Sequence, residues 1–185
     1  MFTLIIICFF TLIINAQEKI KLNTKKSTIT WEGSKLFGFG SHDGTVYFKE
    51  GEVVVKDSKI INGSFIIDMN SIKSNEKETW VYDLIEHLKS KDFFDVKNNS
   101  TSIIVFTNIK YVGDGFVQIT ADLTINKITK SVFFVAKQND TKKQLETRLK
   151  IDRTDFKITY KSQGETSIKD QIISDAISFK VLLNF

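Results

Sequence analysis

Apolar and polar residues alternate along most of the chain. Ile29 and Trp31 share one face of an early segment. Phe65, Ile67 and Met69 share one face of a later one. A period of two is typical of a β-strand that buries one face, so the pattern predicts an all-β protein of about eight to ten strands. The alternating segments cover residues 27–33, 44–51, 52–56, 64–70, 101–108, 109–125, 131–137, 146–152 and 176–185.

Clusters of glycine, asparagine and aspartate lie between these segments and predict tight turns. The strongest hairpin signals are Asn62-Gly63 and Gly113-Asp114-Gly115. The chain has no proline, which is compatible with long, continuously paired strands. Since no repeat or linker divides it, we expect one antiparallel barrel or sandwich. Further turn signals lie at Gly33 and at residues 38–44, 49–51 and 139–140.

Residues 71–95, SIKSNEKETWVYDLIEHLKSKDFFD, break the alternation. Trp80, Leu84 and Leu88 recur every four residues and form one apolar stripe, which is typical of an amphipathic helix. Acidic residues near its start and lysines near its end suit the helix dipole, and Ser74 or Asn75 is a candidate cap. We therefore predict a helix over about residues 75–90, followed by an aromatic pair. In a barrel, such a helix is expected to cover the open mouth; the alternative is that it plugs a solid core.

The first sixteen residues, MFTLIIICFFTLIINA, predict a cleaved signal peptide. The apolar run over residues 4–14 is too short to span a membrane as a helix. Ala16 provides a small residue at the cleavage site, and an uncleaved anchor is the alternative. Cys8 is the only cysteine, so cleavage would leave residues 17–185 without disulfide or thiolate chemistry.

Composition points to apolar contacts rather than to charged ones. The chain has 16 phenylalanines against 4 tyrosines and 2 tryptophans, and phenylalanine brings ring surface without a polar group. The net charge of +4 comes from lysines dispersed among acidic residues. Arginine occurs only at positions 148 and 153, which argues against nucleic-acid binding. A basic surface that binds anionic lipid or polymer remains an alternative.

Candidate catalytic groups are few. His42 lies in a probable turn, and His87 lies on the predicted helix. Their spacing matches no metal motif, so no metal or cofactor is expected. Asp152 and Asp155 could be a carboxylate pair, but local hydrogen bonds in a turn, with Arg153 paired to one of them, explain them more simply. An exported hydrolase or isomerase that uses His42 or the Asp152–Asp155 region remains the alternative function.

The segment SIKSNEKETWVYDLIEHLKSKDFFDV resembles the central signature of the YceI-like family. The shared pattern is Ser-Ile, a helix, His-Leu-x-Ser-x-Asp-Phe-Phe-Asp and a strand that ends in phenylalanine. STITWEGSKLFG, ADLTINKIT and IDRTDFKI resemble three further family motifs, and the likeness spans about residues 20–185. Lys35 stands where the family often has histidine, and Lys127 and Lys157 stand where it has glycine. The signature falls here on Ser71, Ile72, His87, Leu88, Ser90, Asp92, Phe93, Phe94, Asp95 and Phe106.

This resemblance implies an eight-stranded, antiparallel, lipocalin-like barrel that is exported to the periplasm or secreted. It also implies a binding or transport protein without established catalysis, which holds an isoprenoid lipid of the prenyl quinone or polyprenyl phosphate type in its lumen. No nucleic-acid partner is expected, while transient membrane contact and a homodimer are left open. An eight-stranded barrel is about the size that encloses one ligand.

Large apolar residues on the inward faces are the expected ligand contacts, together with the helix stripe and the aromatic pair. Polar residues near the mouth are the candidates for a head group, namely Lys35, His42, Arg153 and Tyr160. The expected apolar contacts are Trp31, Phe37, Phe48, Phe65, Ile67, Trp80, Leu84, Leu88, Phe93, Phe94, Ile104, Phe106, Leu123 and Phe156.

Overall fold

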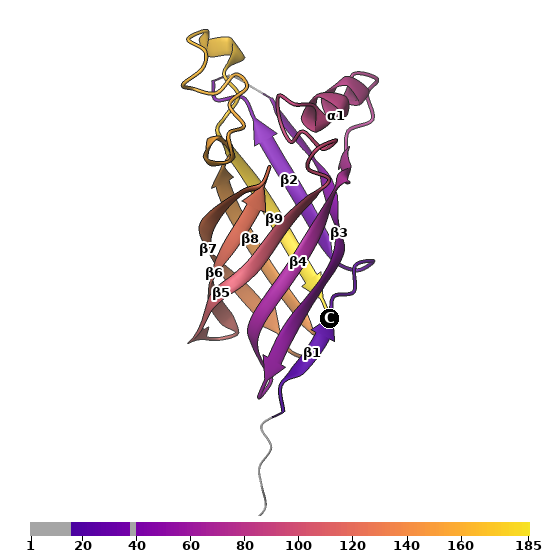
Figure 1. Cartoon of the computed structure of the whole chain (residues 1–185), viewed down its shortest axis with the longest axis vertical. Helices are drawn as coiled ribbons and strands as arrows, with labels where there is room; N and C mark the ends of the chain where they lie inside the picture. The colour runs from indigo at the N-terminus through magenta and orange to yellow at the C-terminus, as the bar shows by residue number, and fades with distance from the viewer. Residues whose placement is uncertain (1–15, 38–39) are drawn as a thin grey trace, which may run out of the picture.

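The computed structural model describes residues 16–37 and 40–185, and residues 1–15 of the expected signal peptide lie outside this range. It is a closed antiparallel barrel with one short α-helix at one end (Figure 1). The elements are β1 (Glu18–Lys21), β2 (Thr28–Ser34), β3 (Ser41–Lys56), β4 (Lys59–Ser74), α1 (Val81–Lys89), β5 (Thr101–Gly113), β6 (Phe116–Ile125), β7 (Ile128–Asn139), β8 (Gln144–Asp152), β9 (Ala176–Asn184) and the 3₁₀ helices η1 (Arg153–Phe156) and η2 (Lys169–Gln171).

Eight strands close the barrel, as the sequence predicted. Their order is β3-β2-β9-β8-β7-β6-β5-β4, and β4 pairs back with β3. The extra strand β1 pairs with the second half of β3, beyond the part that β2 occupies. No helix within the described residues is long and apolar enough to cross a membrane.

The two ends of the barrel differ. Helix α1 and the long segment between η1 and β9 gather at one end, which we call the mouth (Figure 1). The β3–β4, β5–β6 and β7–β8 hairpins gather at the other, which we call the closed end (Figure 1). The predicted Gly113–Gly115 turn joins β5 to β6, with all three residues at positive φ. The predicted turn at residues 139–140 begins the β7–β8 connection.

Other predicted turns are wrong, because their glycines lie inside strands. Gly63 is in β4, where a Cβ atom would lie 2.7 Å from Cδ2 of Phe106. Gly51 is in β3, where a Cβ atom would collide with Cδ1 of Phe65. These glycines therefore make room for aromatic rings. Gly33 likewise lies within β2, and the β3–β4 turn falls instead on Asp57 and Ser58, at φ values of +49° and +62°.

Helix α1 lies within the predicted range but begins later than expected. The Ser74 hydroxyl and the Asn75 backbone N–H each donate to the Asp43 carbonyl at 3.1 Å. These bonds hold the end of β4 against β3, so Ser74 and Asn75 extend the sheet and do not cap the helix. Trp80 occupies the N-cap position without a side-chain bond.

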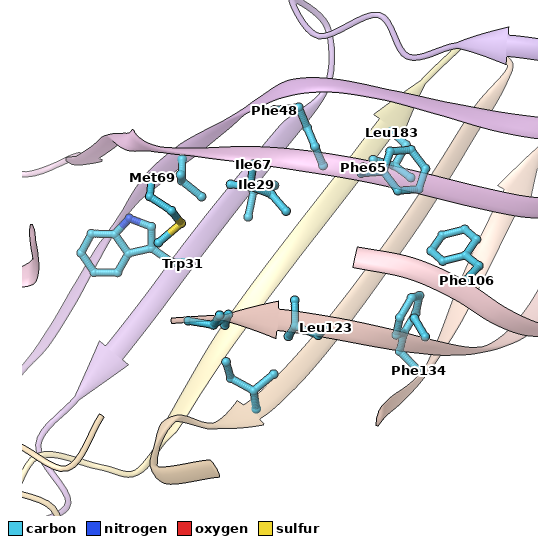
Figure 2. Close-up of a cluster of buried hydrophobic side chains, with 14 of the residues drawn as sticks. Ile29, Trp31, Phe48, Phe65, Ile67, Met69, Phe106, Leu123, Phe134 and Leu183 are labelled. Atoms are coloured by element: carbon cyan, nitrogen blue, oxygen red, sulfur yellow. The ribbon is translucent and has the colours of Figure 1, made fainter. Parts of the chain in front are cut away.

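The buried side chains form one cluster inside the barrel. Figure 2 shows Trp31 and Met69 at one side of the buried cluster and Phe106 and Phe134 at the other. Four phenylalanine rings form a row across the barrel, which we call the aromatic row. Successive centroids lie 6.0 Å apart for Phe48 and Phe65, 5.4 Å for Phe65 and Phe106, and 6.1 Å for Phe106 and Phe134.

One part of the barrel wall is closed by a 3₁₀ helix rather than by strand pairing. β7 pairs with β8 only over Ala136–Asn139. The first half of β7 contacts η1 instead, where Lys130 Nζ lies 3.9 Å from an Asp155 carboxylate oxygen. Phe156, at the end of η1, is fully buried.

Candidate ligand-binding cavity

A cavity of about 380 Å³ occupies the half of the barrel nearest the mouth. Its wall is apolar over most of its area, and charged side chains occur only toward the mouth. Side chains come from every barrel strand except β7, and from α1. The apolar lining consists of Ile29, Trp31, Val46, Phe48, Ile67, Met69, Ile72, Leu84, Leu88, Phe93, Phe94, Ile104, Leu123, Ile125, Leu149, Ile173, Ile177 and Phe179.

Period-two alternation accounts for this lining. The buried positions of β2 are Ile29 and Trp31, and those of β6 include Leu123 and Ile125. Because side chains of a strand point alternately to its two faces, these positions all face the lumen. Nine predicted contacts line the cavity, while their binding of a ligand stays a prediction: Trp31, Phe48, Ile67, Leu84, Leu88, Phe93, Phe94, Ile104 and Leu123.

Five predicted contacts do not line the cavity. Phe37 is 45% exposed, because it lies in the connection that follows β2 and not on a strand. Trp80 is 42% exposed and packs on His42, with ring centroids 5.1 Å apart. Phe65 and Phe106 belong to the aromatic row, and Phe156 is buried in η1.

The mouth gathers all four predicted head-group candidates, since Lys35, His42, Arg153 and Tyr160 line this part of the cavity. Lys161 also lines it and was not among the predicted residues. No role in the site was predicted for His87, although the family signature contains this residue. His87 lines the cavity, packs edge-on against Tyr160 and Phe93, and lies 3.1 Å from Asp92 Oδ2.

Arg153 has a structural role that its sequence position did not reveal. Its side chain is buried and donates to the carbonyls of Ser174, Ile158 and Ile173 at 3.0, 2.7 and 3.0 Å. Its remaining bond is to Asp175 at 3.3 Å, so the predicted pairing with Asp152 or Asp155 is wrong. Burial lowers the pKa of Arg153, and the charge of Asp175 partly offsets this. Four of its five N–H groups are thus engaged, and little donor capacity remains for a head group.

Helix α1 frames the mouth and packs on the core through Ile85 and Leu88. None of its residues is buried, and Tyr82 is 78% exposed. Leu84 and Leu88 turn toward the cavity. The segment before the helix is tied to β3, because His42 Nδ1 lies 3.3 Å from both carboxylate oxygens of Glu76. Helix α1 therefore covers part of the mouth, with Leu84 and Leu88 on the side of the cavity.

The YceI-like domain family matches residues 21–185 of the chain, which includes the whole cavity lining. The chain belongs to the YceI-like family. Related proteins include a UPF0312 protein of Pseudomonas putida, which is 30% identical over 126 residues. That match covers 67% of this chain and 62% of the relative, so the chain aligns with less than two thirds of the relative's length.

Solved structures share this YceI-like fold. BcnA of Burkholderia cenocepacia superposes with a TM-score of 0.70 at 17% identity, over 88% of this chain and 98% of BcnA. The YceI protein of Campylobacter jejuni gives a TM-score of 0.58 at 19% identity, over 82% and 89%. At these identities the likeness concerns the fold alone.

Asp152 and Asp155 of this YceI-like barrel form local structural contacts. Asp152 accepts from the backbone N–H and the hydroxyl of Thr154, at 2.8 and 2.6 Å, and so caps η1. Asp155 points toward Lys130 on the surface. Over residues 16–37 and 40–185, no three His, Cys, Asp or Glu side chains gather as a metal site requires.

Proposed function

We propose that this protein binds a lipid with an isoprenoid tail and carries or sequesters it without catalysis. The observation that supports this most directly is the apolar cavity, which opens beside α1 and has charged groups only at its mouth. Such a site suits a ligand with a long apolar part and one polar end. The isoprenoid class, of the prenyl quinone or polyprenyl phosphate type, follows from the family resemblance.

Burial of the tail can account for useful affinity without charged contacts. At about 0.8 kcal/mol per methylene, ten buried carbons give roughly 8 kcal/mol of gross stabilisation. Immobilising the ligand subtracts several kcal/mol, and the remainder still corresponds to binding. Because this term involves no charge, affinity is expected to change little between low and high salt.

The test uses two variants on one strand. Ile104 lines the cavity, whereas Ile103 beside it is exposed on the outer face of β5. Farnesol titrations followed by tryptophan fluorescence should show binding by the wild type and by Ile103→Asp, and at least tenfold weaker binding by Ile104→Asp. Equal affinity of the two variants would refute binding in the lumen. Steep weakening by salt would favour a basic outer surface instead.

Export, membrane contact and dimer formation are further parts of the proposal. Phe37, Trp80 and Tyr82 are exposed near the mouth, and aromatic side chains of this kind suit a membrane–water interface. We propose that the mouth contacts a membrane transiently during lipid exchange. Co-sedimentation with phosphatidylcholine vesicles tests this contact.

Dimer formation and export have separate tests. Analytical ultracentrifugation tests the homodimer. N-terminal sequencing of the secreted or periplasmic chain tests cleavage after Ala16.

A further inference from the structure

The cavity ends half-way down the barrel. On β4, Ile72 and Ile67 line it, but Phe65, the next inward residue, is 1% exposed and does not. On β5, Ile104 lines the cavity, whereas Phe106, the next inward residue, is buried and does not line it. The ring centroids of Phe65 and Phe106 lie 5.4 Å apart, and both rings belong to the aromatic row, whose four members are labelled in Figure 2. Phe48 lines the cavity and packs on Phe65, with ring centroids 6.0 Å apart, so Phe65 and Phe106 fill the lumen directly below the cavity. We call this pair the floor.

The floor is held rigidly. The ring of Phe65 lies against the backbone at Gly51, and the ring of Phe106 lies against the backbone at Gly63, too close in both cases for a Cβ atom. Phe48 and Phe134 pack on the outer sides of the pair. Rings confined on both sides cannot swing aside without displacing the strands, since close-packed interiors have little free volume.

We infer that Phe65 and Phe106 set the length of ligand tail that the barrel can bury, at about a dozen carbons. The inference rests on the proposed lipid binding. Any further part of a longer tail would have to leave through the mouth, past α1. The floor would thus determine which part of the lipid is enclosed, independently of the head group.

The depth of the cavity leads to this length. The lining along β2 and the residue that follows it extends from Ile29 to Lys35, which at a rise of ~3.3 Å per residue and a strand tilt of ~40° is a depth of roughly 15 Å. An extended chain advances about 1.2 Å per bond, so this depth accommodates about 12 bonds.

The experiment measures affinity against chain length. Straight 1-alkanols of eight to eighteen carbons change the tail one carbon at a time. Trp31 lines the cavity, so its fluorescence in a Trp80→Phe background reports occupancy. Affinity should rise about fourfold per added carbon while the tail is being buried. It should then level off near twelve carbons, with less than about twofold change per further carbon.

Variants of the floor identify its residues. Phe65→Ala and Phe106→Ala should move the plateau to longer alkanols, and the leucine variants serve where alanine prevents folding. Phe134→Ala is the matched control, because it removes a ring of the same row while Phe106 still separates that space from the cavity. Its plateau should stay at the wild-type length. Circular dichroism and thermal unfolding establish that each variant is folded.

The outcomes separate the two proposals. Affinity that keeps rising through eighteen carbons in the wild type overturns the floor but leaves lipid binding intact. A plateau at the same length in all variants also overturns the assignment to Phe65 and Phe106. If no alkanol binds the wild type at any length, the proposed function itself fails.

Discussion

Tyr111 on β5 bonds to the backbone of Ile60 on β4. The Ile60 N–H donates to its hydroxyl at 2.6 Å, and the hydroxyl donates to Gln138 Oε1 at 2.7 Å. β4 and β5 are paired only from Ser64 to Asp68 on β4, so these bonds join the two strands where their ladder has ended. One side chain thus links β4, β5 and β7 near the closed end.

We predict that Tyr111→Phe lowers the free energy of unfolding by about 1–2 kcal/mol, because it leaves the Ile60 N–H and the Gln138 amide oxygen without this partner. Urea denaturation at neutral pH measures the change. Tyr82→Phe is the control, since this hydroxyl belongs to a tyrosine that is 78% exposed, and it should have almost no effect. Equal stability of wild type and Tyr111→Phe would contradict the role of the bond.

The same residue predicts a pH dependence. Burial raises the pKa of Tyr111 above its ordinary value of 10.0. Below pH 10 both the folded and the unfolded chain keep this proton, so its contribution is constant. Above pH 10 the unfolded chain loses the proton first, and the stability of the wild type falls as the pH rises toward the folded-state pKa. The difference in stability between wild type and Tyr111→Phe should therefore shrink above pH 10 in urea titrations.

Arg153→Met should destabilise the protein by about 3 kcal/mol or more, because three backbone carbonyls and Asp175 lose their donors together. Arg148→Met is the matched control, because Arg148 is the only other arginine and is exposed on β8. This substitution should change the free energy of unfolding by less than ~0.5 kcal/mol. Chemical denaturation of both variants makes the comparison. Similar losses would mean that the buried bonds contribute little.

Lys127→Gly should stabilise the β6–β7 hairpin by up to about 1 kcal/mol. Asn126 and Lys127 form its turn at φ values of +49° and +63°, a conformation that Asn-Gly adopts with less strain. Lys110→Gly is the counter-test, because Lys110 is exposed within β5 and glycine weakens a strand interior. Thermal unfolding should show opposite shifts. A lower melting temperature for Lys127→Gly would contradict the prediction.

Glu76→Ala should loosen the cover of the mouth without affecting the barrel. It removes the partner of His42, which ties the segment before α1 to β3. Hydrogen exchange should become faster over residues 75–89 and stay unchanged in β6, and a bound alkanol should dissociate several-fold faster. Glu86→Ala removes an exposed acid from α1 itself and should change neither. Unchanged exchange in Glu76→Ala would show that α1 is held by other contacts.

Much of the fold followed from local chain geometry. Alternation placed Ile67 and Leu123 inside, since consecutive side chains of a strand cannot share a face. The stripe of Leu84 and Leu88 indicated a helix that turns one side toward the mouth. The predicted first residue of the helix was wrong, because Ser74 and Asn75 bond to the backbone of Asp43 instead of capping the helix. Asp43 lies 31 positions before Ser74 in the chain, so no local pattern reveals this bond.

What each inward residue does was decided only by the tertiary structure. Phe65 and Ile67 lie on the same face of the same strand, yet Phe65 is packed into the floor and Ile67 lines the cavity. Gly63 resembled a turn residue and instead makes room for the ring of Phe106. Which side chains point inward could be predicted from the alternation alone, because that depends on neighbouring residues. Where the interior is filled depends on how side chains from distant strands share one volume, which no local pattern specifies.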